Sequence, residues 1–260
     1  MSQPVLVETV AATRIVTLNR PDARNSLTLQ SLDQLAAALD DATSDVAIRC
    51  LVVTGAGGHF CAGADLRQTV QEIDLYSSAL ETTMNAFHEV VKRIVSCEKP
   101  IIAMMDGAAV GFGADLAFAC DLRVASTRAY AQERFVKVGL MPDGGGTFWL
   151  PRLVGTARAM QMMLLAEQID AAQLHRLGVV ATVVGSELLR ETTLAMAGEL
   201  EKGPPLAFAA IKRAMRATWG SADDALRRER HEQLKLLRSQ DFQEGVAAWI
   251  EKRPPRFSGA

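Results

Sequence analysis

The chain has 260 residues, of which 49% are hydrophobic and 22% charged, as in ordinary globular proteins. Its 28 Lys and Arg residues nearly balance its 30 Asp and Glu residues, so the formal net charge is −2. This balance argues against the broad basic surface of a nucleic-acid-binding protein, and the length suits one large domain or one domain with an appendage.

The cysteines and histidines exclude two further kinds of site. No two of the four cysteines form a CxxC pair, and each lies in an apolar stretch, so we expect small buried residues in a reducing compartment. The four histidines lack HxxxH or HExxH spacing, so we expect no metal site.

The start, MSQPVLVETV, lacks the pattern of a signal peptide, and we therefore expect a cytoplasmic protein.

The first half of the chain predicts strands followed by helices. Two β-rich segments, 5–10 and 13–19, are separated by two alanines and favour a hairpin. Leucine and alanine recur at helical spacing over 28–43, which predicts a helix. The pattern then predicts a buried strand at IRCLVVTG, a glycine-rich loop at GAGGHFCAGADL, a long helical region at 69–96 and another buried strand at KPIIAMMDG.

The longest apolar stretch, PIIAMMDGAAVGFGADLAFAC, is about as long as a membrane span. It contains Asp106 and Asp115, and two carboxylates would be very costly in hydrocarbon. We therefore expect a buried strand, a turn and a helix there, and no contact with a membrane.

The second half of the chain becomes progressively more helical. It predicts a short strand at DLRVAS, short helices over 144–176 broken at Gly155, and a last strand at GVVATVV. Helices are then predicted at 186–202, 204–218, 221–239 and 241–251. The fold class is therefore α/β, with a core over 1–200 and a helical region over 201–260.

Two glycine-rich loops follow buried strands, which raises the question of nucleotide binding. GAGGHF has Phe60, and GFGADL has Leu116, where a dinucleotide fingerprint requires its third glycine. The chain also lacks a GxxxxGK[ST] loop and a GxSxG nucleophile motif. Such loops instead suit an oxyanion hole, in which two backbone N–H groups near helix termini stabilise a carbonyl oxygen that gains negative charge.

Five motifs together resemble the crotonase superfamily of enoyl-CoA hydratases and isomerases. They are VTLNRPDARNSLT, HFCAGADL, DGAAVGFGADLAFACDLRVAS, VGLMPDGGGTFWLPRLVG and EKRPPRFSGA. They occur in the family order and span essentially the whole chain. The resemblance implies a spiral of ββα units whose C-terminal helices pack between subunits, in a homotrimer or a hexamer of two trimers. It implies an acyl-CoA thioester substrate and no separate cofactor, since coenzyme A is part of the substrate.

The resemblance also implies which residues form the site. The main-chain N–H groups of Ala64 and Phe112 would form the oxyanion hole, although many family members have glycine at position 112. Arg24 and Arg67 would lie near the CoA phosphates, but each alone is equally well explained as a solvated surface charge. Residues expected to contact CoA or substrate are Arg24, Ala64, Asp65, Leu66, Arg67 and Phe135.

The reaction depends on which acids occupy the site. Hydratases of this family use two glutamates, and the corresponding positions here are Asp115 and Phe135. Phenylalanine transfers no proton, and nearby Glu133 is expected to face the surface. Asp143, in GLMPDGGGTFWLP, matches the acid of dienoyl-CoA isomerases and of the 1,2-epoxyphenylacetyl-CoA isomerase type. A purely structural role is open to each aspartate: Asp143 as a helix cap, and Asp115 as a stabilising charge at a helix N-terminus.

We therefore favour an enoyl-CoA isomerase in which Asp143 and Asp115 are the catalytic acids. A hydratase that holds water between these two aspartates is the first alternative, and a non-catalytic acyl-CoA-binding relative is the second. Apolar surroundings would raise the pKa of the catalytic carboxylate toward useful base strength. The aromatic residues expected around it are Phe112, Phe135, Phe148 and Trp149.

Overall fold

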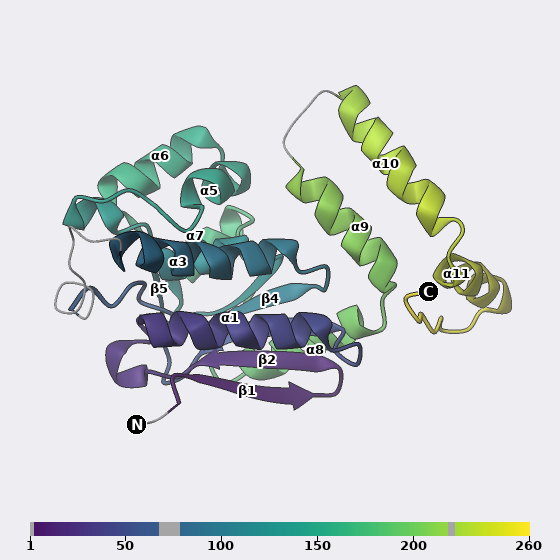
Figure 1. Ribbon diagram of the computed structural model, residues 1–260, viewed down its shortest axis with the longest axis horizontal. Helices are drawn as coiled ribbons and strands as arrows, with labels where there is room; N and C mark the ends of the chain where they lie inside the picture. The colour runs from purple at the N-terminus through teal and green to yellow at the C-terminus, as the bar shows by residue number, and fades with distance from the viewer. Residues whose placement is uncertain (1–2, 68–78, 218–221) are drawn as a thin grey trace.

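A six-stranded sheet forms the centre of the molecule (Figure 1). The computed structural model describes residues 3–67, 79–217 and 222–260. In sheet order the strands are β1 (Val5–Val10), β2 (Thr13–Leu18), β3 (Cys50–Gly55), β4 (Ile101–Met105), β6 (Leu122–Ser126) and β9 (Thr182–Val184). The predicted β1–β2 hairpin is confirmed, and the remaining neighbours pair in parallel.

Helices cover both faces of this sheet, which explains why β3 and β4 are buried along nearly their whole length. In β3, Cys50 and Val52 belong to a core cluster with residues of α8 (Leu189–Glu201). Leu51 and Val53 point the other way, because side chains alternate along a strand, and they join the main core. That core contains α1 (Leu29–Ser44), α3 (Ala79–Ser96) and α4 (Phe112–Ala119).

A second, three-stranded sheet was not predicted from the sequence. It consists of β5 (Ala108–Val110), β7 (Tyr130–Gln132) and β8 (Gln168–Asp170). Strands of three residues are too short to show a period of two, so only tertiary pairing reveals them. This sheet matters for function because β5 leads directly into the second glycine-rich loop and α4.

Short helices follow β7, as the sequence predicted. A 3₁₀ helix, η2 (Phe135–Val138), precedes α5 (Gly146–Val154) and α6 (Thr156–Leu165). The predicted break at Gly155 is confirmed: this glycine has φ of +78°, which residues with a side chain rarely adopt. The other short helices are η1 (Pro21–Ala23) and α7 (Ala171–Arg176).

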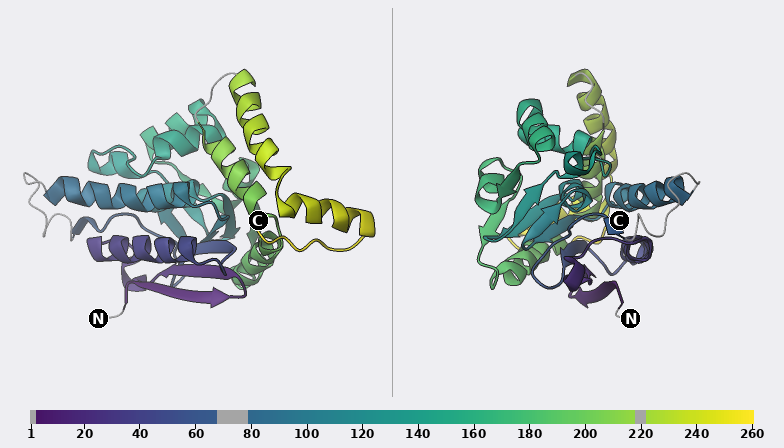
Figure 2. Two further views of the ribbon diagram at one scale, coloured as in Figure 1. Left: turned by 45° about the vertical axis from the view of Figure 1, so that its right-hand side comes forward. Right: turned by 90° about the vertical axis from the view of Figure 1, so that its left-hand side faces the viewer.

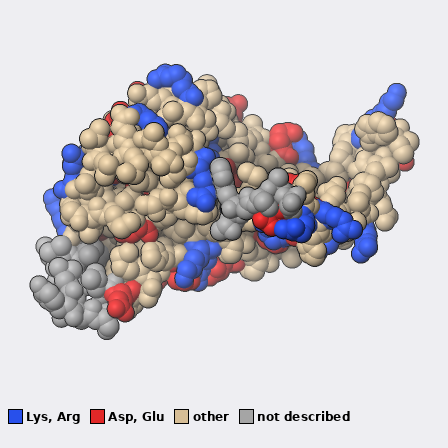
Figure 3. Space-filling model, turned by 90° about the horizontal axis from the view of Figure 1, so that it is seen from above, with Lys and Arg blue, Asp and Glu red and all other residues tan. Residues whose placement is uncertain are grey.

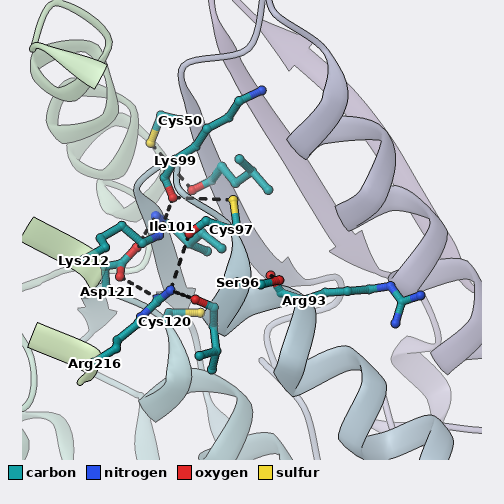
Figure 4. A network of polar contacts seen from close by, with 12 residues as sticks. Cys50, Arg93, Ser96, Cys97, Lys99, Ile101, Cys120, Asp121, Lys212 and Arg216 are labelled. Atoms are coloured by element: carbon teal, nitrogen blue, oxygen red, sulfur yellow. Dashed lines mark hydrogen bonds and ion pairs between the residues drawn. The ribbon is translucent and has the colours of Figure 1, made fainter. Parts of the chain in front are cut away.

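Three C-terminal helices extend away from the sheet (Figures 1 and 2). They are α9 (Pro205–Arg216), α10 (Ala222–Leu236) and α11 (Gln240–Glu251), with α9 and α10 side by side. Figure 4 shows how α9 is attached to the core: Lys212 and Arg216 both contact Asp121, at 2.6 Å and 2.8 Å. Asp121 also accepts a hydrogen bond from the backbone N–H of Ile101, so this contact joins α9 to the start of β4.

The long apolar stretch contains the expected buried strand, β4, and the expected helix, α4, with the unpredicted short strand β5 between them. Within the described ranges, no helix is long and apolar enough to cross a membrane. On the face shown in Figure 3, basic and acidic side chains are interspersed.

Candidate active site

Two backbone loops meet at the site, and glycines allow their close approach. The first passes through Gly63 and Ala64, and the second through Gly111 into α4. A Cβ on Gly113 would overlap the carbonyl oxygen of Cys61, and a Cβ on Gly63 would lie 2.8 Å from the carbonyl oxygen of Val110. Side chains at either glycine would therefore force the two loops apart.

This approach leaves two N–H groups available. Leu27 donates to the carbonyl of Gly63 and accepts from the N–H of Asp65, so the N–H of Ala64 between them is not used in this pairing. Phe112 begins α4, and the first N–H groups of a helix have no partner within it. Among the described residues, neither the Ala64 nor the Phe112 N–H donates a hydrogen bond. The two N–H groups lie on loops in close contact, since a Cβ on Gly63 would be 3.4 Å from the nitrogen of Phe112.

A cavity of about 370 Å³ opens beside these groups. Its size falls within the range of small-molecule sites. Residues from the sequence prediction that line it are Arg24, Ala64, Leu66, Phe112, Phe135 and Asp143. Lining residues that the sequence did not reveal include Phe87, Tyr130, Arg134, Val138 and Leu140. They come from distant segments, so no local pattern predicts their meeting.

Asp143 is the only acid among the described residues that line this cavity. Its Oδ1 is buried and has no hydrogen-bond partner within the described part of the chain. Burial raises the pKa of Asp143, and the nearby charge of His88 partly opposes this shift. The N-cap of α5 is Gly145, with no side-chain cap, so the alternative of a helix cap for Asp143 is wrong.

Asp115 occupies a different position. It lies on α4, is fully buried, and does not belong to the cavity lining. Its Oδ2 accepts a hydrogen bond from the N–H of Gly144 at 2.8 Å. Asp115 therefore binds the turn after Asp143 from the side away from the cavity, whereas Asp143 lies on the cavity side. Burial raises its pKa, and the charge of Asp143 acts in the same direction.

The expectation that Glu133 faces the surface is wrong. Its side chain is 1% exposed and lies beside Asp115. A Cβ built on Gly146 would overlap Oδ1 of Asp115 and would lie 3.2 Å from Oε1 of Glu133. Gly144 and Gly146 are thus needed because carboxyl groups pack directly against their backbone, whereas a Cβ on Gly145 would meet Trp149.

The predicted CoA contacts divide into two groups. Arg24 and Leu66 line the cavity, whereas Asp65 and Arg67 do not. Asp65 pairs instead with Arg20 at 2.9 Å, which fixes the first loop against the turn before α1. Arg67 is exposed beyond the cavity lining.

The predicted aromatic surroundings are half right. Phe112 and Phe135 line the cavity. Phe148 and Trp149 lie outside its lining and pack against each other, with 4.6 Å between their ring centroids. Phe87 of α3 supplies a lining ring instead, in edge contact with Phe112 at 4.7 Å. The apolar wall therefore depends on how α3 packs on α4.

The chain is similar to known proteins along nearly its whole length. The family model for enoyl-CoA hydratase/isomerase matches residues 8–260. A probable enoyl-CoA hydratase from Rhodobacter capsulatus is 41% identical over 94% of both chains, and a 1,2-epoxyphenylacetyl-CoA isomerase from Escherichia coli is 39% identical over 94% of both. The crystal structure of an enoyl-CoA hydratase from Polaromonas sp. JS666 is 33% identical, covers 97% of this chain and 99% of that one, and has a TM-score of 0.93.

The chain therefore belongs to the enoyl-CoA hydratase/isomerase family and has the crotonase fold. It is an enzyme of that family.

Proposed function

We propose that this enzyme moves a double bond within an enoyl-CoA thioester, with Asp143 as the proton-transferring group. The observation that carries the proposal is the single acid in the described cavity lining, beside two N–H groups without hydrogen-bond partners among the described residues. One carboxylate suffices to carry a proton from one carbon to another, because it accepts the proton and then returns it.

The chemistry follows from this arrangement. With a 3-enoyl thioester bound, the N–H groups of Ala64 and Phe112 hold the carbonyl oxygen. The Asp143 carboxylate removes a proton from C2, and the electron pair moves onto that oxygen as a dienolate, which the two donors stabilise. The Asp143 carboxylic acid then returns the proton to C4. The C3–C4 double bond is lost, a C2–C3 double bond forms, and no atom is added.

Hydration of a 2-enoyl thioester is the second candidate. It is favoured by the proximity of the two aspartates, because the charge of Asp143 contributes to the raised pKa of Asp115. A hydratase needs two carboxyl groups in contact with the same water. The Asp115 carboxyl packs against Gly144 and Gly146, and Asp115 lies outside the cavity lining. This position supports isomerisation over hydration.

Mass spectrometry distinguishes the two reactions. Purified enzyme is incubated with 2-enoyl, 3-enoyl and dienoyl thioesters, separately in deuterium oxide and in ¹⁸O-labelled water. Isomerisation gives products of unchanged elemental composition with no ¹⁸O. Deuterium enters at C4 only to the extent that the proton on Asp143 exchanges with solvent before it returns. Incorporation of ¹⁸O into the acyl chain, without a shifted double bond, would replace the isomerase proposal by the hydratase.

We further propose a cytoplasmic homotrimer, or a hexamer of two trimers. Support for assembly comes from the C-terminal helices, which expose large apolar side chains: Leu226, Leu234, Leu237, Phe242, Val246, Trp249 and Ile250. An apolar groove of about 400 Å³ lies between α9, α10 and α11. The four cysteines are free and buried, which suits a reducing compartment.

A further inference from the structure

The carboxyl groups of Asp115 and Glu133 lie next to each other behind the turn that contains Asp143 and Gly144–Gly146. Oδ1 of Asp115 and both carboxyl oxygens of Glu133 are buried and lack a hydrogen-bond donor among the described residues. The remaining oxygen, Oδ2 of Asp115, accepts from the N–H of Gly144. Two ionised carboxylates in a buried site repel each other and lose their hydration, so the pair needs to retain one proton.

The backbone directs Glu133 into this position. The carbonyl of Gln132 accepts a hydrogen bond from the N–H of Gly111 at 2.8 Å, and the Gln132 side chain donates to the carbonyl of Ala166 at 2.8 Å. Gln132 is thus held to the second glycine loop on one side and to the end of α6 on the other. Glu133, the next residue, is directed into the interior beside α4.

We propose that Glu133 is a positioning residue: it shares one proton with Asp115, and this hydrogen-bonded pair holds the Gly144–Gly146 turn so that Asp143 faces the substrate cavity. Glu133 acts through Asp115 and the turn, since it is absent from the cavity lining. The role rests on the proposed function, in which Asp143 transfers the proton.

The charged groups around Glu133 agree with a shared proton. The charges that act on it are those of Asp115 from α4 and Asp143 from the turn before α5, and both are acidic. Burial is the main cause of the raised pKa of Glu133, and the negative charge of Asp115 raises it further. Because the N–H of Gly144 donates to Asp115 and no described group donates to Glu133, the negative charge of the pair lies on Asp115 and the proton on Glu133.

A pH dependence follows from this arrangement. An unfolded glutamate releases its proton near pH ~4.3, whereas the folded pair retains one proton above that pH. The folded state then binds more protons than the unfolded state, so the free energy of unfolding falls as the pH rises through neutrality. When the last proton leaves, two charges lie behind the turn and Asp143 is displaced. The wild-type turnover rate should therefore decline on the alkaline side.

Three variants test the proposal. Glu133→Ala removes the donor, and kcat should fall by about 10²-fold with little change in KM, because a displaced catalytic group costs this much. Glu133→Gln keeps a donor that does not titrate, so it should restore most of the rate lost in Glu133→Ala and abolish the alkaline decline. Glu199→Gln removes an exposed glutamate of α8 and should leave the pH profile of the wild type unchanged.

Two results would overturn the proposal: identical pH profiles for wild type and Glu133→Gln, or a folded Glu133→Ala with wild-type kcat. Should Glu133→Ala not fold, the comparison of wild type with Glu133→Gln still decides.

A readout without turnover separates this proposal from the isomerase proposal. Hydrogen–deuterium exchange of the 139–151 segment should increase at alkaline pH in the wild type and remain unchanged with pH in Glu133→Gln, after correction for intrinsic exchange. If this difference in exchange is found but the enzyme moves no double bond, the isomerase proposal is refuted and the positioning role stands. Isomerase activity with the same exchange in both proteins would refute the positioning role alone.

Discussion

At the scale of single residues, the structure places the two aspartates proposed from the sequence, Asp143 as the principal acid and Asp115 as the second, in different positions. Asp143 lines the cavity and has a buried oxygen without a hydrogen-bond partner in the described chain. Asp115 lies behind the turn, where one of its oxygens accepts from Gly144. In the proposed reaction, Asp143 exchanges a proton with the substrate, and Asp115 holds the backbone turn that carries Asp143.

Replacing each aspartate by asparagine should separate these roles. Asp143→Asn should abolish isomerisation and leave acyl-CoA binding close to normal, because it removes proton transfer and keeps the oxyanion donors. Asp115→Asn keeps an acceptor for Gly144 and should cost less. Steady-state kinetics and calorimetric binding of an acyl-CoA measure both effects. Near wild-type turnover of Asp143→Asn, together with an inactive Asp115→Asn, would reverse the assignment.

Gly146 provides a second residue-scale test. In Gly146→Ala the new Cβ overlaps Oδ1 of Asp115, so the turn must shift and activity should fall by at least tenfold. Gly198→Ala is the matched control: this glycine lies within α8, and its Cβ meets no atom within 4 Å. That control should raise the free energy of unfolding by ~0.5–1 kcal/mol. Thermal unfolding and kcat of both variants check the prediction, which equal activities would contradict.

At the scale of elements, the site is made where two loops and a helix N-terminus converge. The loop after β3 carries Ala64, and the loop after β5 enters α4 at Phe112. Both donors are backbone groups, so the sequence has to provide only small neighbours and close packing. Phe112 keeps its backbone N–H whatever its side chain, and its ring packs on Phe87.

Proline at position 64 removes one donor while the side chain stays small. Because the Ala64 N–H makes no hydrogen bond within the described chain, Ala64→Pro should fold and lose roughly 10²–10³ in turnover. Circular dichroism checks the fold, and kcat with an enoyl thioester checks the loss. A folded variant with the wild-type rate would show that HFCAGADL is not an oxyanion loop. Phe112→Gly keeps the second N–H and should retain activity on small thioesters, with altered acyl preference.

At the scale of the whole molecule, the C-terminal helices need a surface to pack on. They project from the sheet (Figure 2), and the apolar side chains on α10 and α11 are exposed in the single chain. Trp249 is 82% exposed, which is unusual for so large an apolar residue unless a partner covers it. This arrangement agrees with the proposed trimer, in which a second copy would cover these helices.

A charge at the centre of this surface should prevent assembly. Trp249→Glu would bury a carboxylate in an apolar contact, so the proposed trimer should dissociate toward monomer. Light scattering of the wild type and the variant at equal concentration measures the change. Val46→Glu is the control, because Val46 is 93% exposed just after α1 and lies on none of the three C-terminal helices. A stable, monodisperse wild-type monomer would refute the trimer.

The sequence by itself determined the layered α/β core and the helical C-terminal region, because long periodic segments such as 28–43 and 204–218 carry their own signal. It also determined the two glycine loops, since backbone donors require small residues that a motif records. Tertiary structure alone decided the three-residue strands of the second sheet, the burial of Glu133 and the replacement of Phe148 and Trp149 by Phe87 in the cavity wall. Each of these depends on contacts between segments far apart in the chain, and the local sequence around a residue contains no record of which distant segment packs against it.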